Sequence, residues 1–343
     1  MTYVLEPTEI PLTRTSFTTR LAGWPRVVIG LAVIALFVPT LARAQGDGAR
    51  FYWKGLTGAT VVPIVFNMKS GNTNPFDPAH TVLGDSNFDA SLMMAGFGRA
   101  LAVSDRAASV SVLFPMGSLS GQAVVDGKAA TLSAGGFGDP MLQFGLNFVG
   151  PKAIKNIPDI LRYEPGFSID VIASLAVPIG EYNNEQPLNI GQNRWYGRIG
   201  APVVWQLGSW APESRTTLEF LPALWFFGPN NDFVGKTMKT DPLFQLEGHL
   251  THNFAKGFWA SLDAAWYSGG KATIDGVAGE KLNNTGLFFT AGYELNENAQ
   301  LTVGYGSTLN DNDPSDLRMN QFRVTLVYFW HPLIEGMKRL GGN

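Results

Sequence analysis

The chain has 343 residues, of which 45% are hydrophobic and only 15% are charged, with a formal net charge of −3 and no cysteine. The length allows two soluble domains or one large barrel, and the charged fraction lies well below the roughly 25% of ordinary soluble domains. The charge balance provides no basic surface for nucleic acid, and the lack of cysteine excludes disulfides, thiolate metal sites and cysteine nucleophiles.

The N-terminal region has the pattern of a secretory signal peptide. Two arginines precede the apolar run 27–38, and an Ala-x-Ala cleavage site follows at residues 42–44. The run is shorter than the ~18 residues of a membrane helix, although a membrane anchor remains the alternative. We therefore expect a cleavable signal peptide at residues 1–44 and export from the cytoplasm.

The rest of the chain to residue 330 alternates between short strand-like runs and stretches rich in Gly, Asn, Asp and Pro. Such punctuation is typical of an all-β protein. We expect twelve strands, at residues 57–68, 88–102, 106–116, 137–148, 166–178, 195–207, 215–227, 241–253, 257–268, 285–295, 299–308 and 320–330. The connector 151–164 contains isoleucines at helical spacing, and we favour an irregular connector over a short helix there.

Residues in these runs alternate between an apolar and a polar face. In the last run, Phe322 to Trp330 in steps of two are apolar or aromatic, whereas Gln321 and Arg323 fall on the opposite face. Aromatic residues bracket the apolar face of several runs, as in the girdles of outer-membrane barrels. A soluble sandwich also alternates, but it has no reason to place its large aromatic rings at both rims of one face. The pattern favours a transmembrane antiparallel up-and-down β-barrel at residues 45–330.

The connections give a second indication, because long and short ones alternate along the chain. Outer-membrane barrels have long extracellular loops and short periplasmic turns, and an even strand count returns the chain to the periplasm. We expect the last strand to pair with the first, and residues 331–343 to form a periplasmic tail. Outer-membrane barrels generally end on an aromatic strand that the barrel-assembly machinery recognises, whereas this chain continues beyond it. Either Tyr328–Trp330 serves as an internal recognition signal, or the tail folds back beneath the barrel.

Four short motifs resemble a known family: Gly136-Phe137-Gly138-Asp139-Pro140, Tyr163-Glu164-Pro165-Gly166, Asn189–Arg194 and Asp241-Pro242. They are similar to motifs of the outer-membrane transporter family named for the MetA pathway of phenol degradation. The resemblance implies a barrel in the outer membrane of a Gram-negative bacterium that takes up hydrophobic substrates. It assigns no catalytic residue.

The motifs themselves have structural explanations. Asp139-Pro140 and Asp241-Pro242 stand near the start of strands, where proline is tolerated and aspartate can accept hydrogen bonds from nearby backbone. The loop Asn189–Arg194 either folds into the lumen as a constriction or caps the following strand, and we favour the cap.

Charged side chains on the polar face are the candidates for lining the lumen. They are Asp89, Arg99, Asp139, Asp170, Arg198, Glu219, Glu247, His249, Asp263, Glu294 and Arg323. Such charges either set selectivity along a solute path or form ion pairs that hold the barrel interior together. A second, apolar lining set is Trp225, Phe227, Trp259, Tyr267 and Phe288.

These features predict a channel for passive uptake of small hydrophobic or aromatic compounds, with membrane lipid as its surroundings. The alternative is a structural or adhesion barrel that acts through its long loops. No Gly-x-Ser-x-Gly motif occurs, and His249 with Glu247 is too common a pair to indicate a metal site. We therefore expect no catalytic residue, no metal and no cofactor.

Overall fold

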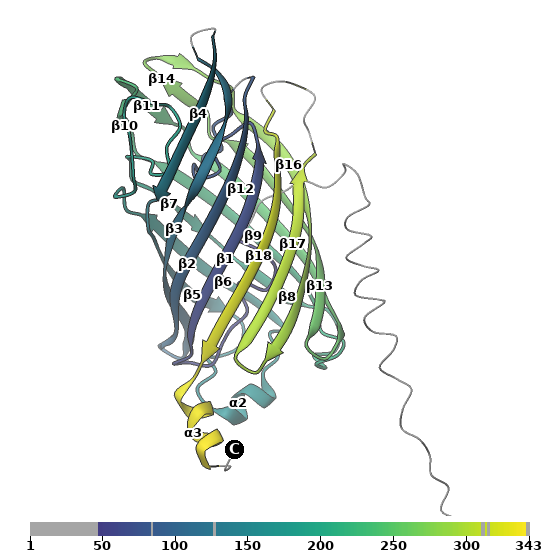
Figure 1. The fold of residues 1–343 in the computed structure, drawn as a ribbon. Helices are drawn as coiled ribbons and strands as arrows, with labels where there is room; N and C mark the ends of the chain where they lie inside the picture. Colours follow the sequence, from purple (N-terminus) through teal and green to yellow (C-terminus); the bar gives the residue numbers. More distant parts are fainter. Residues whose placement is uncertain (1–46, 84, 126–127, 310–312, 314–315, 341–343) are drawn as a thin grey trace, which may run out of the picture. The chain divides into compact units, whose positions relative to one another are not determined.

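A computed structural model describes residues 47–83, 85–125, 128–309, 313 and 316–340 (Figure 1). The predicted signal peptide lies outside these residues. Within them, no helix is both long enough and apolar enough to cross a membrane.

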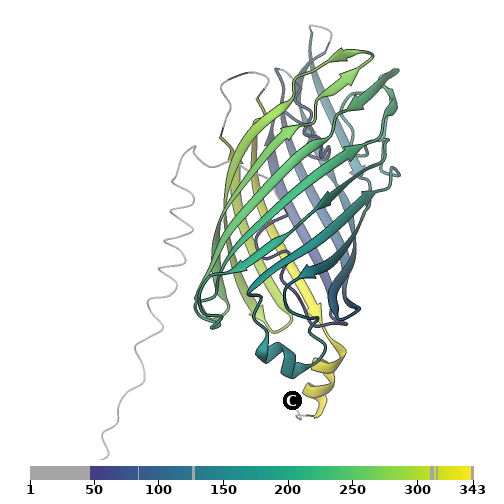
Figure 2. The same ribbon diagram turned by 180° about the vertical axis from the view of Figure 1, so that it is seen from behind.

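The described chain forms a closed antiparallel β-barrel of twelve strands (Figures 1 and 2). Two of the twelve are interrupted and carry two labels each, namely β4 with β5 and β7 with β8. The strands are β1 (Thr60–Gly71), β2 (Asn87–Val103), β3 (Arg106–Val125), β4 (Lys128–Phe137), β5 (Met141–Val149), β6 (Phe167–Ala176), β7 (Tyr196–Gly200), β8 (Val203–Gln206), β9 (Thr216–Phe227), β12 (Leu243–Ala255), β13 (Phe258–Gly269), β16 (Leu282–Asn296), β17 (Ala299–Thr308) and β18 (Met319–Trp330). Each strand pairs with its neighbour in the chain, and β18 pairs with β1 from Trp330 opposite Thr60 to Met319 opposite Gly71. The predicted closure between the last and first strands is confirmed.

The predicted alternation is confirmed on most strands. On β13, for example, Leu262 and Trp266 are exposed on the outer surface, whereas Ser261 and Asp263 are buried inside the barrel. A closed barrel leaves no backbone edge unpaired, so its outer face can be apolar throughout. The same arrangement gives the lumen most of its charged side chains.

The alternation of connection lengths is also confirmed, apart from the long connection between β5 and β6, which the sequence already shows as an exception. We call the end that carries the long connections the loop end, and the opposite end the turn end. Two helices follow strands at the turn end, α2 (Ile157–Arg162) and α3 (Pro332–Leu340) (Figure 1). The expectation of an irregular connector at 151–164 is therefore wrong for six residues, which Asn156 caps by accepting a hydrogen bond from the Asp159 N–H at 3.0 Å.

The long connections contain strands of their own. Residues 117–125 and 128–136 pair as a hairpin of β3 and β4 that extends beyond the barrel wall, rather than forming a loop. Four short strands form a separate sheet at the loop end: β10 (Asn230–Phe233), β11 (Lys236–Thr240), β14 (Ala272–Ile274) and β15 (Val277–Ala278). One expected strand is interrupted between β7 and β8, where Pro202 has no N–H to donate to the sheet.

Candidate functional site

The lumen is not empty, because the chain before β1 runs through it. We call residues 47–56 the inner segment. The Asp47 N–H donates to the Glu247 carboxylate at 2.8 Å, and the Arg50 N–H donates to the Glu219 carboxylate at 3.0 Å. The indole N–H of Trp53 donates to the other Glu219 oxygen at 2.8 Å. Carboxylates of β9 and β12 therefore fasten the backbone of the inner segment along one wall of the barrel.

Ion pairs fasten the side chains of the inner segment as well. The Asp47 carboxylate accepts from the buried Arg198 guanidinium and from the Tyr52 hydroxyl. The Lys54 ammonium lies 3.1 Å from Asp170 on β6, the strand next to β7. Buried charges are tolerated only when they are paired in this way.

Arg50 is held by two aromatic rings as well as by hydrogen bonds. Its guanidinium carbon lies 4.3 Å from the ring centroid of Trp53 and 4.3 Å from that of Trp259. Trp259 is 1% exposed, and it fits because β16 has Gly292 opposite it, where a Cβ would fall 2.2 Å from the indole. The glycine thus makes room for the ring against which Arg50 packs.

A row of acidic and imidazole side chains lies beside the inner segment. His249 Nδ1 is 2.8 Å from Asp263, and its Nε2 is 3.4 Å from Glu247. Asp263 also accepts a hydrogen bond from Thr290 at 2.6 Å. These carboxylates are engaged by protein partners. Among the described residues, no group of three or more potential ligands is arranged to hold a metal ion.

A second insertion enters the lumen at the loop end. We call residues 72–83 together with 85 and 86 the loop plug. Asp77 in this plug forms a buried ion pair with Arg194 at 2.9 Å, and Asn74 donates to the Asn189 carbonyl at 2.6 Å. Asn189, Gln192 and Arg194 are buried, so the preference for a cap at Asn189–Arg194 is wrong and the constriction alternative is correct.

His80 in the loop plug reaches the wall that β13 contributes. Its ring packs edge-on against Tyr267, with 5.1 Å between centroids. Burial and, to a smaller extent, the charge of nearby Lys69 lower the pKa of His80 from 6.5 to about 4, against the opposite effect of Asp77. The imidazole is therefore neutral in the closed loop plug at physiological pH.

Most of the predicted charged residues do face inward. Asp170, Arg198, Glu219, Glu247, His249, Asp263 and Arg323 meet in the lumen or contact the inner segment there. Glu294 borders the cavity at the turn end, where it is exposed. Asp139 is buried but serves as a clamp, since it accepts from the Gly180 and Gln192 N–H groups at 2.9 and 2.8 Å. Asp139 thus accepts hydrogen bonds from backbone, as its motif predicted, but the donors lie 41 and 53 residues away in the chain rather than nearby.

Two of the predicted lumen residues do not point inward. Asp89 and Arg99 are exposed and share the outward face of β2 with Phe97. Arg99 borders the cavity at the turn end, but its strand partner Val110 is also exposed on the outside. The prediction fails for Asp89 because β2 is inverted at the loop end: Phe88 and Leu92 face inward, where they pack under the loop plug against Phe76. Arg99 lies nearer the turn end, on an outward face that is otherwise apolar there.

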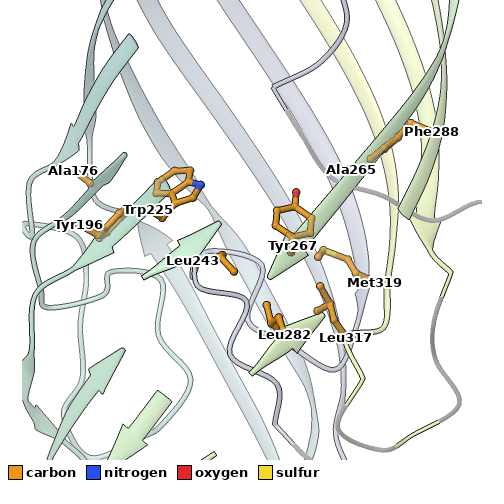
Figure 3. Packing of buried hydrophobic residues seen from close by; sticks show 10 residues of the cluster. All are labelled: Ala176, Tyr196, Trp225, Leu243, Ala265, Tyr267, Leu282, Phe288, Leu317 and Met319. Carbon is orange, nitrogen blue, oxygen red and sulfur yellow. The ribbon is translucent and has the colours of Figure 1, made fainter. Parts of the chain in front are cut away.

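The second predicted set, of inward aromatic residues, is found inside the barrel. Trp225, Trp259, Tyr267 and Phe288 are buried, and Phe227 packs against the same cluster. Figure 3 shows several of them on the inner surface of the wall. A cavity of about 780 Å³ lies between the inner segment and the wall. Phe288, Val327 and Leu113 line it together with Arg323 and His249.

The inner segment was missed by sequence reasoning. It carries Asp47, Arg50 and Lys54 around three consecutive aromatics, Phe51, Tyr52 and Trp53, directly before the first strand. So many charged and aromatic residues together are unusual in an exposed linker, and this composition could have indicated a buried segment. Lys69 and Asn67, both buried on the inward face of β1, were also missed.

This architecture is a closed twelve-stranded antiparallel barrel whose lumen holds the inner segment and a cavity beside it. The COG4313 outer membrane channel from Pseudomonas putida F1 has this fold, with a TM-score of 0.65 at 19% identity over 83% of this chain and 100% of that chain. The translocator domain of autotransporter NalP from Neisseria meningitidis gives 0.45 at 12% identity over 89% and 96%. The transport unit of autotransporter AIDA-I from Escherichia coli gives 0.41 at 10% identity over 90% and 97%.

The sequence itself identifies the family. The family model described as "Putative MetA-pathway of phenol degradation" matches residues 71–325, and the chain belongs to this family. The match runs from the end of β1 to the middle of β18 and so covers nearly the whole barrel. No curated protein matches the chain.

Proposed function

We propose that the protein is a channel in the outer membrane of a Gram-negative bacterium, exported by a cleavable signal peptide, for passive uptake of small hydrophobic or aromatic compounds. The loop end would face the outside and the turn end the periplasm. The fold and the family support a channel, and the contents of the lumen support its selectivity.

The cavity of about 780 Å³ inside the wall is the observation that carries this proposal. Small-molecule sites are commonly of 300–1,000 Å³, mostly apolar and provided with a few polar groups. Here Phe288, Val327 and Leu113 supply apolar wall, and Arg323 and His249 supply polar groups. A single-ring aromatic compound fits such a space. A general water-filled pore has no need of a cavity with an apolar wall.

The two insertions support selectivity rather than open diffusion. The loop plug narrows the lumen at the loop end through the pair Asp77–Arg194, and the inner segment narrows it towards the turn end through the pair Asp47–Arg198. Constrictions that carry fixed charges are how channels discriminate between solutes. No catalytic residue is needed for this role.

The alternative function, a structural or adhesion barrel, is favoured by the ordered sheet of β10, β11, β14 and β15 and by the projecting hairpin of β3 and β4. These elements give the loop end an ordered surface of paired strands, which a simple channel does not require. The uptake experiment below distinguishes the two functions.

The test is uptake across an intact outer membrane, because its lipopolysaccharide leaflet is the barrier that such solutes meet. The full chain is expressed in a porin-deficient Gram-negative host, and the initial uptake of a labelled alkylbenzene is compared with that of the host carrying an empty vector. We expect at least a fivefold increase. An unchanged rate, with the barrel folded in the outer membrane, would contradict uptake and favour the adhesion function.

A further inference from the structure

Within the described part of the chain, Lys69 is a lumen cation for which the structure shows no partner. Lys69 is 6% exposed on the inward face of β1, and among the described residues its ammonium makes no hydrogen bond or ion pair. An unpaired buried ammonium is costly, because burial removes its water without supplying a counter-charge. A lysine at such a buried position is therefore either neutral or binds an anion.

The carboxylates that could neutralise Lys69 are engaged elsewhere. Asp77 pairs with Arg194, Asp47 with Arg198 and Asp170 with Lys54. Farther along the lumen, Asp263 holds His249 and Thr290, while Glu219 and Glu247 bind the backbone of the inner segment. The positive charge at Lys69 is therefore left for a ligand.

The surroundings of Lys69 are rich in hydrogen-bond donors. Lys69 is paired with Gln321 in the β-sheet register, and one step along the same face Asn67 is paired with Arg323. The Arg323 guanidinium donates to the Asn67 amide oxygen at 3.1 Å. From the loop plug, His80 lies within range of the charge of Lys69. Its Nδ1 has no hydrogen-bond partner among the described residues, although His80 is only 4% exposed.

Apolar side chains adjoin this group of donors. Met319 precedes Gln321 by two residues on the inward face of β18, and it belongs to a buried cluster with Leu317 and Tyr267 (Figure 3). The Tyr267 ring is the one that His80 contacts. A ligand that places a negative group at Lys69 thus meets aromatic and aliphatic surface beside it.

We propose that Lys69, with Arg323 and His80, forms a binding site beneath the loop plug for the carboxylate of a small aromatic acid. Two or three donors around one ammonium suit a carboxylate, and the adjoining Tyr267 and Met319 suit an aromatic ring. The site lies on the path from the loop plug to the cavity that Arg323 borders. This inference deepens the proposed function, on which it rests, by adding organic anions to the compounds that the channel takes up.

The test measures binding to the refolded full-length mature protein in detergent, at low ionic strength without chloride or phosphate. The probes are benzoate, its neutral analogue benzyl alcohol, and acetate, each followed by equilibrium dialysis. We expect benzoate to bind more tightly than both others. Lys69→Met should weaken benzoate at least tenfold and leave benzyl alcohol within twofold, because a charge-assisted hydrogen bond is lost.

Two further variants make the test decisive. Lys69→Arg keeps the charge and should restore most of the benzoate affinity. Lys271→Met removes a charge outside the lumen, where Lys271 faces Asp241 at 3.6 Å, and should leave benzoate binding unchanged. Heat-modifiable migration on gels confirms that each variant is folded.

Three outcomes would overturn the proposal. One is equal binding of benzoate and benzyl alcohol, and another is unchanged benzoate binding in Lys69→Met, as a neutral lysine would give. The third is equal affinity for acetate and benzoate with full displacement by chloride, which would mean a site for small anions only. Failure of the proposed function is recognised separately: benzoate binding without any uptake by cells would refute the channel and leave the site standing.

Discussion

The charged side chains in the lumen mainly hold the inner segment and the loop plug in place, rather than lining an open path. Asp47–Arg198 and Lys54–Asp170 join the inner segment to the neighbouring strands β7 and β6, and Asp77–Arg194 joins the loop plug to the loop before β7. Removing one partner from a buried pair leaves the other charge uncompensated, which is far costlier than replacing both. The function of each insertion therefore depends on a few identifiable residues.

Arg198→Ala should release the inner segment. It leaves the Asp47 carboxylate without its guanidinium, at a cost of about 3–5 kcal/mol if the pair stays buried. The chain contains no cysteine, so a single cysteine replacing Ala49 can report exposure without interference. We expect its labelling by a maleimide to be at least tenfold faster in the Arg198→Ala background. Arg99→Ala, which removes an outward arginine, is the control. Equally faster labelling in both variants would contradict the conclusion that Asp47–Arg198 holds the inner segment.

His80 makes the loop plug sensitive to acid. Its pKa in the closed plug is about 4, against 6.5 for the free side chain. Between these values the released plug binds a proton that the closed plug does not, so closure loses stability as the pH falls from 6.5 towards 4, by on the order of 3 kcal/mol. The groups around His80 are Lys69, Asp77 and the ring of Tyr267.

Hydrogen exchange of the loop plug measures this effect. After correction for the intrinsic pH dependence of exchange, protection of residues 72–86 should be lower at pH 4.5 than at pH 7. His80→Gln should remove most of that difference. The same pH dependence in the variant would show that another group controls the plug.

At the scale of elements, the strands were predictable and the insertions were not. Each strand has a period of two that the sequence displays directly, as on β13, and its register follows from that period and from short turns. The inner segment has no period, because its contacts come from β6, β9 and β12, which lie more than a hundred residues away. The inversion of β2 at the loop end was equally hidden, since it depends on apolar residues of the loop plug.

Shortening the chain before β1 should widen the channel without unfolding it. A mature chain that begins at Lys54 lacks the contacts of Asp47, Arg50 and Trp53 but keeps all twelve strands and the closure of β18 on β1. We expect its single-channel conductance in planar bilayers to be several times that of the complete chain, because water and ions replace the segment. The matched control replaces residues 123–130 of the outer hairpin by Asn-Gly.

The control deletion should leave conductance unchanged, because the hairpin extends beyond the barrel wall. Equal conductance of all three proteins would mean that the inner segment does not limit the path.

At the scale of the whole molecule, the sequence was sufficient for a twelve-stranded barrel with lipid outside and charge inside. The reason is physical: the outer face must be apolar on every strand, so the pattern repeats twelve times and single errors such as Asp89 do not change the count. The lumen obeys no such repetition. Residues there pair according to what fills the space, so Arg198 and Glu219 could be predicted to point inward but not to bind the inner segment.

The central claim, that solutes pass through this lumen, is tested most directly by blocking it at a chosen residue. Val327 lines the cavity, and its neighbour Leu326 faces outward and is 38% exposed. Each is replaced by a single cysteine in the cysteine-free chain, and cells are treated with a bulky maleimide until mass spectrometry shows complete modification. Modified Val327→Cys should lose most of its alkylbenzene uptake, while modified Leu326→Cys keeps it. Undiminished uptake through fully modified Val327→Cys would contradict passage through the barrel.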